Sequence, residues 1–326
     1  MPVIRALVVL MWLMGPAAFA QGRSDAMQGY PDRPIRMVTV SAAGGSTDIL
    51  ARQTAQKLGE LLGQQVVVDN RAGGGGIIAS EIAARAQPDG YTLLFTHTAH
   101  TVIPSLHAKL SYDALKDFSP VSLVAYSQNV LLVHPSVPAK TVKELIELAK
   151  AQPGKLNYSA GTTGASVHLA SELFKLMAGV NIVHVPYKGG AAQVTALIAG
   201  EVQMTFTTIP AALPHIKAGR LRALAVGNPK RSAALPDVPT VAEAALPGFD
   251  VSGWNGILAP ARTPKAIVTR INRDIATISA NPDLKEKSLI HGVELTSNSP
   301  EEFGAYLRAQ MAQWAKVVKA SGMRPD

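Results

Sequence analysis

The sequence predicts an α/β protein that folds into two domains. From Pro34 onward, short β-rich runs alternate with helical patterns, which is typical of βαβ units built around parallel strands. A chain of 326 residues has room for two domains of roughly 100 to 200 residues each, and 47% hydrophobic residues can fill their cores. Glycine-rich segments stand between several expected strands and the helices that follow, where open α/β sheets bind ligands.

The first third of the chain contains two strand, loop and helix units. Leu50, Leu58 and Leu61 lie on one side of an expected helix, and the turn Pro88-Asp89-Gly90 precedes the third strand. We expect strands at residues 35–40, 65–69 and 91–96, and helices at residues 49–62 and 78–86.

The rest of the chain repeats this scheme. Thr141 with Glu144 and Thr240 with Glu243 match the capping box that starts a helix. We expect strands at residues 130–133, 156–159, 182–185, 202–206, 221–226 and 251–258. Helices are expected at residues 142–151, 166–177, 191–199, about 264–280 and from residue 300. The last helix carries a stripe that we expect to pack in a core: Phe303, Leu307, Met311, Trp314 and Val318.

The first 20 residues have the layout of a secretory signal peptide. Arg5 precedes the apolar run 6–14, and the small-residue triplet Ala18-Phe19-Ala20 follows as a cleavage site. The alternative, a lone membrane anchor, is disfavoured because the run is well short of the roughly 20 residues that span a bilayer. We therefore expect export, cleavage after Ala20 and a soluble mature chain, which contains no cysteine for a disulfide or a lipid anchor.

The basic balance of the chain does not indicate a nucleic-acid partner. The formal net charge is +8, but lysines and arginines are scattered as singles and pairs, with no basic run interleaved with aromatic residues. We interpret the charge as a solvated surface whose mild positive field helps to attract anions.

Three segments share one design, in which a strand ends, a Gly/Ser/Thr loop follows and a helix begins: residues 43–48, 72–76 and 161–166. The first turn of a helix leaves N–H groups without partners and carries partial positive charge, so an anion is a natural ligand there. One glycine loop is more often only a tight turn or a helix cap. Three of them at the carboxyl ends of expected parallel strands favour an anion site.

The patterns of common enzymes are absent or incomplete. Residues 74–79 fit G-x-G-x-x-A after a strand, but the next strand ends in Thr96 and His97 instead of the acid that would hold a ribose. The sequence contains no P-loop, no nucleophile elbow and no catalytic cysteine. His97 and His100 lack further ligands at metal spacing, and His168 and His184 are interpreted as partly buried histidines near the cleft. We expect no metal and no cofactor.

Taken in order along the chain, several segments resemble one family, the TctC-like or Bug substrate-binding proteins of tripartite tricarboxylate transporters. The resemblance covers the mature chain from Tyr30 to the last helix. The segments that carry it are residues 30–35 (YPDRPI), 44–52 (GGSTDILAR), 70–75 (NRAGGG), 88–94 (PDGYTLL), 184–190 (HVPYKGG), 213–219 (LPHIKAG) and 235–240 (LPDVPT).

The resemblance implies a two-lobed periplasmic binding protein of the type II-like class, in which two strands cross between lobes built on mostly parallel sheets. Residues 28–123 and 249–326 would form one lobe and residues 124–248 the other. The implied function is capture of a small organic carboxylate by a monomer in the periplasm and its delivery to membrane transporter subunits or, in a variant use, to a sensor. An exported α/β enzyme acting on a carboxylate remains the alternative.

The resemblance also implies which residues bind the ligand, and we add to them residues at the ends of the strands beside the loops. The first lobe would contribute Ser41, Ala42, Gly44, Gly45, Ser46, Thr47, Asp48, Gly73, Gly74, Gly75, Gly76, Ile77 and Thr96. The second lobe would contribute Thr162, Thr163, Ala165, Ser166, His168, Tyr187, Gly189 and Thr207.

Three departures from the family pattern affect the pocket. Residues 40–45 (VSAAGG) lack the usual aromatic residue, Ala72 replaces a proline, and Thr207 stands where the family often has an aspartate that holds a ligand's amino group. We therefore expect a carboxylic acid without a cationic group instead of an amino acid.

Overall fold

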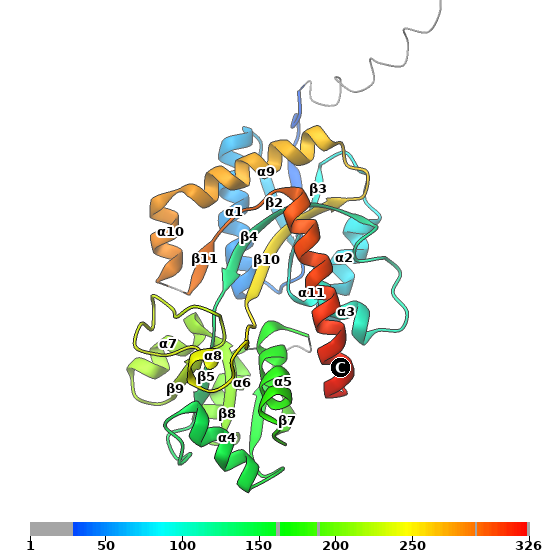
Figure 1. The fold of residues 1–326 in the computed structure, drawn as a ribbon. Coiled ribbons are helices and arrows are strands. Elements are labelled where there is room, and N and C mark those ends of the chain that lie inside the picture. The colour runs from blue at the N-terminus through cyan, green and yellow to red at the C-terminus, as the bar shows by residue number, and fades with distance from the viewer. Residues whose placement is uncertain (1–28, 161–163, 188–189, 291, 325–326) are drawn as a thin grey trace, which may run out of the picture.

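The protein consists of two α/β lobes, shown one above the other in Figure 1. The computed structural model describes residues 29–160, 164–187, 190–290 and 292–324, so the signal peptide expected at residues 1–20 lies outside the described residues. One lobe contains a six-stranded sheet and the other a five-stranded sheet, which confirms the predicted fold class. Within the described ranges, no helix combines the length and the apolar character needed to cross a membrane.

The six-stranded sheet has the order β11-β4-β10-β3-β1-β2. Strand β1 pairs in parallel with β2 and β3, so the carboxyl ends of these three strands meet at one edge of the sheet. Strand β10 runs antiparallel to β3 and β4, and β11 runs antiparallel to β4. The bounds are β1 (Ile35–Thr39), β2 (Val66–Asn70), β3 (Thr92–His97), β4 (Phe118–Ser127), β10 (Gly253–Pro260) and β11 (Val293–Leu295).

The five-stranded sheet has the order β7-β6-β8-β5-β9. Strand β6 pairs in parallel with β7 and β8, whereas β5 lies antiparallel to β8 and β9. Both sheets are therefore mixed, and the expected parallel pairing is limited to the strands that precede the glycine-rich loops and their neighbours. The bounds are β5 (Asn129–Val133), β6 (Asn157–Ala160), β7 (Val183–Pro186), β8 (Met204–Thr208) and β9 (Arg222–Val226).

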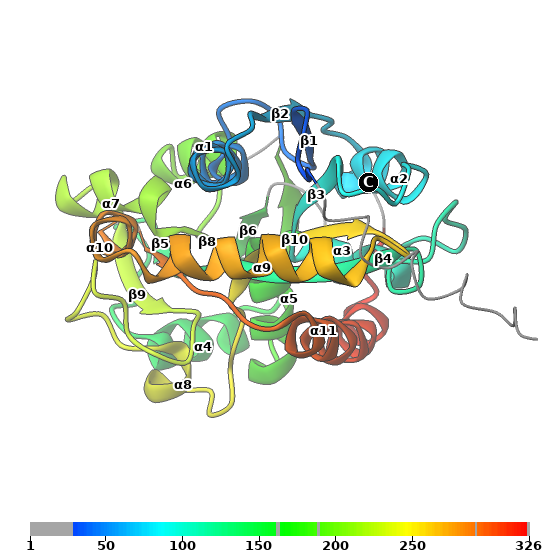
Figure 2. The same ribbon diagram turned by 90° about the horizontal axis from the view of Figure 1, so that it is seen from above.

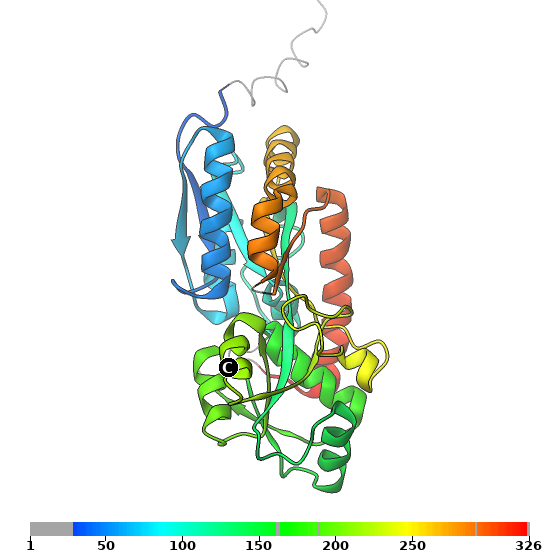
Figure 3. The same ribbon diagram turned by 90° about the vertical axis from the view of Figure 1, so that its left-hand side faces the viewer.

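Helices cover both faces of each sheet, and α1 and α11 lie on opposite sides of the six-stranded sheet (Figures 2 and 3). The capping box expected at Thr240 is complete, because its hydroxyl accepts from Glu243 N while Glu243 accepts from Thr240 N. The helices are α1 (Ser46–Leu62), the 3-10 turn η3 (Gly74–Gly76), α2 (Ile77–Ala84), α3 (Ala99–Leu106), α4 (Val142–Ala151), α5 (Ser166–Ala178), α6 (Gly190–Ile198), α7 (Ile209–Lys217), α8 (Val241–Ala244), α9 (Lys265–Ala280), α10 (Pro282–Leu289) and α11 (Pro300–Ser321).

Two segments connect the sheets. Strand β4 passes through Gln128 directly into β5, and the chain returns through residues 249–252 into β10. Buried Asn129 ties these two segments together, since its side-chain amide donates to Val251 O at 3.2 Å. The lobe limits expected at residues 124 and 248 lie a few residues from these points and stay predictions.

Helix α11 joins the cores of the two lobes. Its first half contributes Phe303 and Leu307 to a cluster with β3, β4 and β10, whereas Trp314 and Val318 in its second half pack with the core of the five-stranded sheet. The expected core stripe is therefore confirmed for these four residues, but its two halves serve different lobes. Trp314 is 1% exposed in the core of the five-stranded sheet, and burial of an aromatic side chain stabilises a protein by about 2 kcal/mol. Trp314 therefore helps to hold the two lobes together on the side where α11 lies.

The sequence analysis did not predict several of the helices and strands. No element was expected between residues 97 and 129, where α3 and the long strand β4 form, nor at α7, α10 and β11. Proline explains two omissions: Pro104 lies inside α3, and α7 contains Pro210 and Pro214. Pro210 is tolerated because the first turn of a helix has no internal partner for the N–H that proline lacks.

Candidate functional site

A cleft of about 940 Å³ lies between the lobes, within the size range of small-molecule sites. Residues from both sheets line it, and most belong to loops or to first turns of helices. The lining from the first lobe is Val40, Ser41, Ala42, Gly44, Gly45, Ser46, Ile49, Ala72, Gly73, Gly74, Gly75, Gly76, His97, Ile103, Leu106 and His107. The lining from the second lobe is Val167, Tyr187, Gly190, Ala191, Gln193, Thr207, Thr208, Pro210 and Ala211.

The first glycine loop joins β1 to α1. Gly44 has a φ of 81°, in the left-handed region that favours glycine, and Gly45 caps α1 in an extended conformation. A Cβ atom on Gly45 would lie only 2.6 Å from Ser41 Oγ and 3.3 Å from Ala42 O. No side chain caps α1, so the N–H groups of its first turn remain for a ligand.

A buried carboxylate braces this loop against the second one. Asp48 accepts hydrogen bonds from Gly44 N at 2.8 Å and Arg52 Nε at 3.1 Å, and its other oxygen accepts from Asn70 Nδ2 at 2.7 Å. The same Asn70 amide donates to Ser41 O at 2.9 Å, and Arg52 donates to Asn70 Oδ1 at 2.8 Å. Burial raises the pKa of Asp48, but the three hydrogen bonds outweigh it and the pKa lies below its usual value.

The second glycine loop is a run of left-handed residues between β2 and α2. Gly73, Gly74, Gly75 and Gly76 all have positive φ, at 130°, 54°, 66° and 111°. A Cβ atom on Gly76 would also lie 3.0 Å from Val40 Cγ1. Residues other than glycine pay a strain energy in this region, so the backbone path beside the cleft depends on the glycines.

Two helices of the second lobe begin at the opposite wall. Helix α6 starts at Gly190, and Ala191 lines the cleft. Helix α7 starts after Thr208, whose side chain does not cap it, and Pro210 lines the cleft in its first turn. Together with α1 and α2, four helix N-termini of the described chain therefore face one cavity.

Neutral polar side chains complete the second-lobe wall. Gln193 is 1% exposed and donates from Nε2 to Phe206 O at 3.1 Å, whereas its Oε1 has no hydrogen-bond donor among the described residues. Tyr187 donates from its hydroxyl to Glu201 at 3.0 Å, and Thr207 is 2% exposed at the end of β8. None of the described lining residues is a lysine, arginine, aspartate or glutamate.

His97 lines the cleft, although the sequence analysis did not include it among the ligand-binding residues. It follows Thr96 at the carboxyl end of β3. Burial, with a further contribution from His100, lowers the pKa of His97 to about 4. Its Nδ1 accepts from Ala99 N at 3.2 Å, so the neutral ring carries its proton on Nε2 and acts as a hydrogen-bond donor at neutral pH. Its position at the carboxyl end of a parallel strand was the available signal.

The structure brings together about half of the predicted site residues. The cleft is lined by the predicted residues Ser41, Ala42, Gly44, Gly45, Ser46, Gly73, Gly74, Gly75, Gly76, Tyr187 and Thr207. Predicted residues that do not line it are Thr47, Asp48, Ile77, Thr96, Ala165, Ser166 and His168. Thr162, Thr163 and Gly189 lie outside the described residues.

Local contacts explain why several predicted residues do not reach the cleft. Thr47 accepts from Asn255 Nδ2 at 3.3 Å, and Ser166 packs against Gly253 where β10 begins. Thr96 is buried within the sheet, beside Gly256 of β10. His168 stacks on His184, with ring centroids 4.5 Å apart, in the interior of the second lobe.

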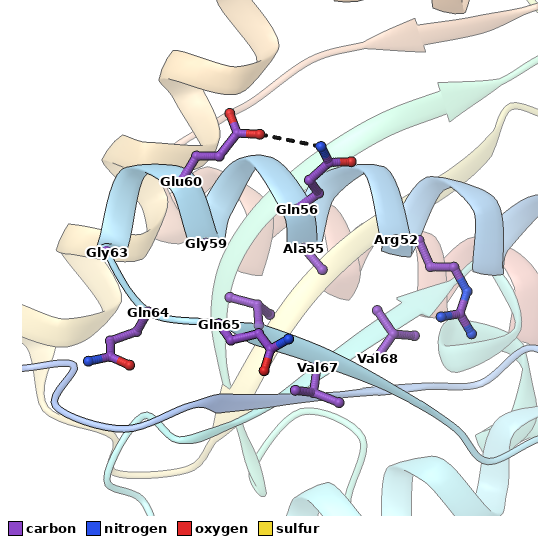
Figure 4. Close-up of a pocket in the computed structure, with 11 residues that line it drawn as sticks. Arg52, Ala55, Gln56, Gly59, Glu60, Gly63, Gln64, Gln65, Val67 and Val68 are labelled. Carbon is purple, nitrogen blue, oxygen red and sulfur yellow. Dashed lines mark hydrogen bonds between the residues drawn. The ribbon is translucent and has the colours of Figure 1, made fainter.

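A second hollow of about 740 Å³ lies outside the cleft, between α1 and the edge strand β2 (Figure 4). Its charged residues are already paired, because Arg52 contacts Asp48 and Glu60 accepts from Lys57 and Gln56. No helix begins there, so it lacks the amide donors of the cleft. Nor do the described residues contain a group of three or more His, Asp or Glu side chains placed to hold a metal ion.

Comparison with known proteins identifies the family. Residues 50–323 match the model of the tripartite tricarboxylate transporter family receptors, called TctC. The chain is similar to the solved structure of Rpa4515 from R. palustris with adipate, with 37% identity and a TM-score of 0.83 over 91% of this chain and 100% of that one. It also resembles the periplasmic binding protein BugD, at 34% identity and a TM-score of 0.79 over 90% and 99% of the two chains.

A further similar structure is MatC from Rhodopseudomonas palustris with bound malate, which is 30% identical with a TM-score of 0.78 over 89% of this chain and 100% of that one. The family and these neighbours are solute-binding proteins, and two of them hold dicarboxylates. The chain therefore belongs to the TctC family and is a solute-binding protein of the Bug/TctC type.

Proposed function

We propose that this protein is a periplasmic solute-binding protein that captures a small dicarboxylate in the cleft between its lobes and delivers it to a membrane transporter of the tripartite tricarboxylate type. The observation that carries the proposal is the convergence of four helix N-termini, two from each lobe, on one cavity. Helix N-termini attract anions through free N–H groups and the aligned peptide dipoles.

The arrangement offers two separate anion positions. In the first lobe, the first turns of α1 and α2, which follow the Gly44-Gly45 loop and the glycine run, would hold one carboxylate. In the second lobe, the first turn of α6 would hold another, together with Ala211 N of α7, because Ile209 N already donates to Gln128 O and Pro210 has no N–H. Ile103 and Leu106 of α3 also line the cleft and give a methylene chain an apolar surface between the two positions. A dicarboxylate would contact both lobes and stabilise the closed form.

The absence of charged side chains from the described lining limits the ligand class. A cationic group on the ligand would need a carboxylate or a cage of acceptors, whereas the described lining offers Thr207 and neutral groups. This supports a carboxylic acid without an amino group. The adipate and malate bound by the two R. palustris proteins support the same class.

The roles in export and transport follow from the family and from the leader sequence. A signal peptide at residues 1–20 would direct the chain to the periplasm, where BugD is a binding protein. The receptors of this family are named for a tripartite transporter, which supports membrane subunits as the partners that accept the ligand.

Titration calorimetry with three matched six-carbon acids tests the ligand class. Adipate has a carboxylate at each end, hexanoate lacks the second, and 6-aminohexanoate replaces it with an ammonium group. We expect adipate to bind at least ten-fold more tightly than either comparison acid, and malate serves as a shorter dicarboxylate. Equal affinity for hexanoate would refute the two-position arrangement. Chromatography of the incubated acids provides a second test, since conversion without a partner would favour the exported enzyme.

A further inference from the structure

A third pocket lies beside the two segments that connect the lobes, and it is partly open to solvent. It has a volume of about 290 Å³ and receives residues from both connecting segments, from the loop after β9, from β11 and from α11. Figures 2 and 3 show that α11 lies on the side of the sheet opposite α1, whose first turn lines the ligand cleft. The lining residues are Tyr126, Gln128, Asn228, Pro229, Lys230, Asp250, Ser252, Glu294, Tyr306, Gln310 and Trp314. We call it the rear pocket.

The rear pocket is acidic and aromatic. Asp250 and Glu294 line it, and neither forms an ion pair with a described residue, although Asp250 accepts hydrogen bonds from Ser252 N and Oγ at 3.1 and 2.8 Å. The rings of Tyr126 and Tyr306 meet edge to face with centroids 6.2 Å apart. Burial, together with both carboxylates, raises the pKa of Tyr126, so its ring stays neutral beside the two negative charges.

Gln128 gives an independent indication that the rear pocket takes a polar ligand. This residue is only 9% exposed and lines the pocket. Its backbone is fully used, because N donates to Gly292 O at 2.9 Å and O accepts from Ile209 N at 3.2 Å. Its side-chain amide has no hydrogen-bond partner among the described residues, and its polar atoms stay accessible to solvent in the pocket. A polar ligand in the pocket can therefore form hydrogen bonds with this amide.

The lining chemistry selects a cation. Two carboxylates supply negative charge, the faces of Tyr126 and Tyr306 attract cations, and Gln128 offers an amide oxygen. The opposing feature is Lys230, which is exposed like Asp250 and Glu294 and forms no ion pair with either of them, so the carboxylates outnumber it by two to one. We propose that the rear pocket binds a small aliphatic ammonium ion, with its charged group between the two carboxylates and its alkyl part against the tyrosines.

The position of the rear pocket predicts coupling to the ligand cleft, and this step rests on the proposed function. Tyr126 and Gln128 belong to one connecting segment, Asp250 and Ser252 to the other, and Lys230 and Tyr306 to elements of different lobes. Lobe closure about these segments changes the spacing of the rear walls. An ammonium ion that binds one spacing better must therefore change the affinity for the dicarboxylate, and the two effects must be equal in size.

Binding of butylammonium to the mature protein tests the site. We expect saturable binding by calorimetry or ligand-observed NMR against a sodium-matched buffer, and no binding of 1-butanol, which has the same chain without the charge. Asp250→Asn combined with Glu294→Gln should weaken butylammonium at least ten-fold. Glu301→Gln, which removes an exposed carboxylate at the start of α11, should leave it unchanged.

Further variants keep the test decisive if the double variant is unstable. Gln128→Leu retains both acids and should weaken butylammonium about five-fold, and circular dichroism checks that each variant is folded. Equal binding to the double variant and the native chain would overturn the site, as would no binding of butylammonium to the native chain. Tighter binding of 4-aminobutyrate than of butylammonium would overturn the cation class, because Lys230 would then hold a carboxylate.

The coupling is measured separately by titrating adipate with and without saturating butylammonium. We expect the adipate affinity to change by at least two-fold and the butylammonium affinity to change by the same factor. Binding of butylammonium with no change in adipate affinity would refute the coupling and leave the rear site standing. Failure of butylammonium binding while adipate still binds would refute the rear site and leave the proposed function intact.

Discussion

The brace formed by Asp48 provides the sharpest test of how the first lobe binds an anion. Asp48 does not touch the cleft, yet it holds Gly44 of the first loop and Asn70 beside the second. We predict that Asp48→Asn loosens both loops and weakens ligand binding without removing any cleft-lining group. The substitution keeps the size of the side chain and changes only its charge and one acceptor.

The expected cost follows from the hydrogen bonds. Asp48 accepts from Gly44, Arg52 and Asn70, and an asparagine can present one acceptor oxygen while its NH₂ group faces a remaining donor. A mismatched buried donor costs about 1 to 3 kcal/mol, and the exposed partner Arg52 adds less than about 1 kcal/mol. We expect the free energy of unfolding to fall by about 3 kcal/mol. Restoring order to one loop residue on binding costs about 1.5 kcal/mol, or roughly ten-fold in adipate affinity.

A second buried aspartate supplies the matched control. Asp274 accepts from Arg270 at 2.8 Å with the same four-residue spacing as Asp48 and Arg52, and its side chain is 7% exposed against 3% for Asp48. It lies on α9, away from the cleft lining. Chemical denaturation and adipate titration of both variants should show destabilisation in each and lost affinity only in Asp48→Asn. Unchanged adipate affinity in folded Asp48→Asn, or an equal loss in Asp274→Asn, would refute the reasoning.

Three further predictions concern single residues. Gly45→Val should weaken adipate at least ten-fold with a smaller loss of stability, because its side chain would press on Ser41 at the cleft wall, and native-like affinity in calorimetry would contradict this. His97→Phe should weaken adipate about five-fold. Because the pKa of His97 is about 4, native affinity should stay flat from pH 8 to 6, where both carboxylates of adipate are still mostly ionised, and a midpoint near pH 6.5 would exclude a neutral donor. Burial lowers the pKa of His100 to about 4, so the unfolded chain binds more protons than the folded chain between pH 4 and 6.5. The contribution of His100 to the free energy of unfolding should therefore fall by about 3 kcal/mol as the pH drops through that range. Denaturation curves of His100→Gln, whose side chain can still donate to Ala114 O, should show a weaker dependence of stability on pH.

The first-lobe part of the site was predictable because its signals are local. Gly44, Gly45 and the run from Gly73 to Gly76 adopt conformations that depend on glycine, and each precedes a helix. A sequence displays such positions directly, since glycine is the residue that enters the left-handed region without strain. Asp48 was predicted as a ligand contact, and that role stays a prediction. Its hydrogen-bond partners Gly44 and Asn70 lie four and 22 residues away, and only the folded loops bring all three together.

The second-lobe wall and the strand β4 were harder to predict, because their signals are not local. Thr208 and Pro210 begin α7, yet two prolines in nine residues suggest a loop to any pattern based on helix propensity. Strand β4 pairs antiparallel with β10, more than 100 residues later in the chain, so no neighbouring sequence indicates it. The rear pocket was not predictable for the same reason, because Gln128, Asp250 and Tyr306 are far apart in the sequence and come together only in the folded chain.

The chain carries a net charge of +8, but the described cleft contains no lysine or arginine, and this contrast explains how the site can be selective. Arg52, the cation nearest the first loop in sequence, is bound to Asp48 and Asn70 instead of the cleft. A lysine would attract any anion and would lose side-chain entropy on binding it, whereas helix amides are already fixed and point in set directions. In the proposed function, surface charge would speed the arrival of anions, while the amides of two lobes would retain those whose carboxylates have the right separation.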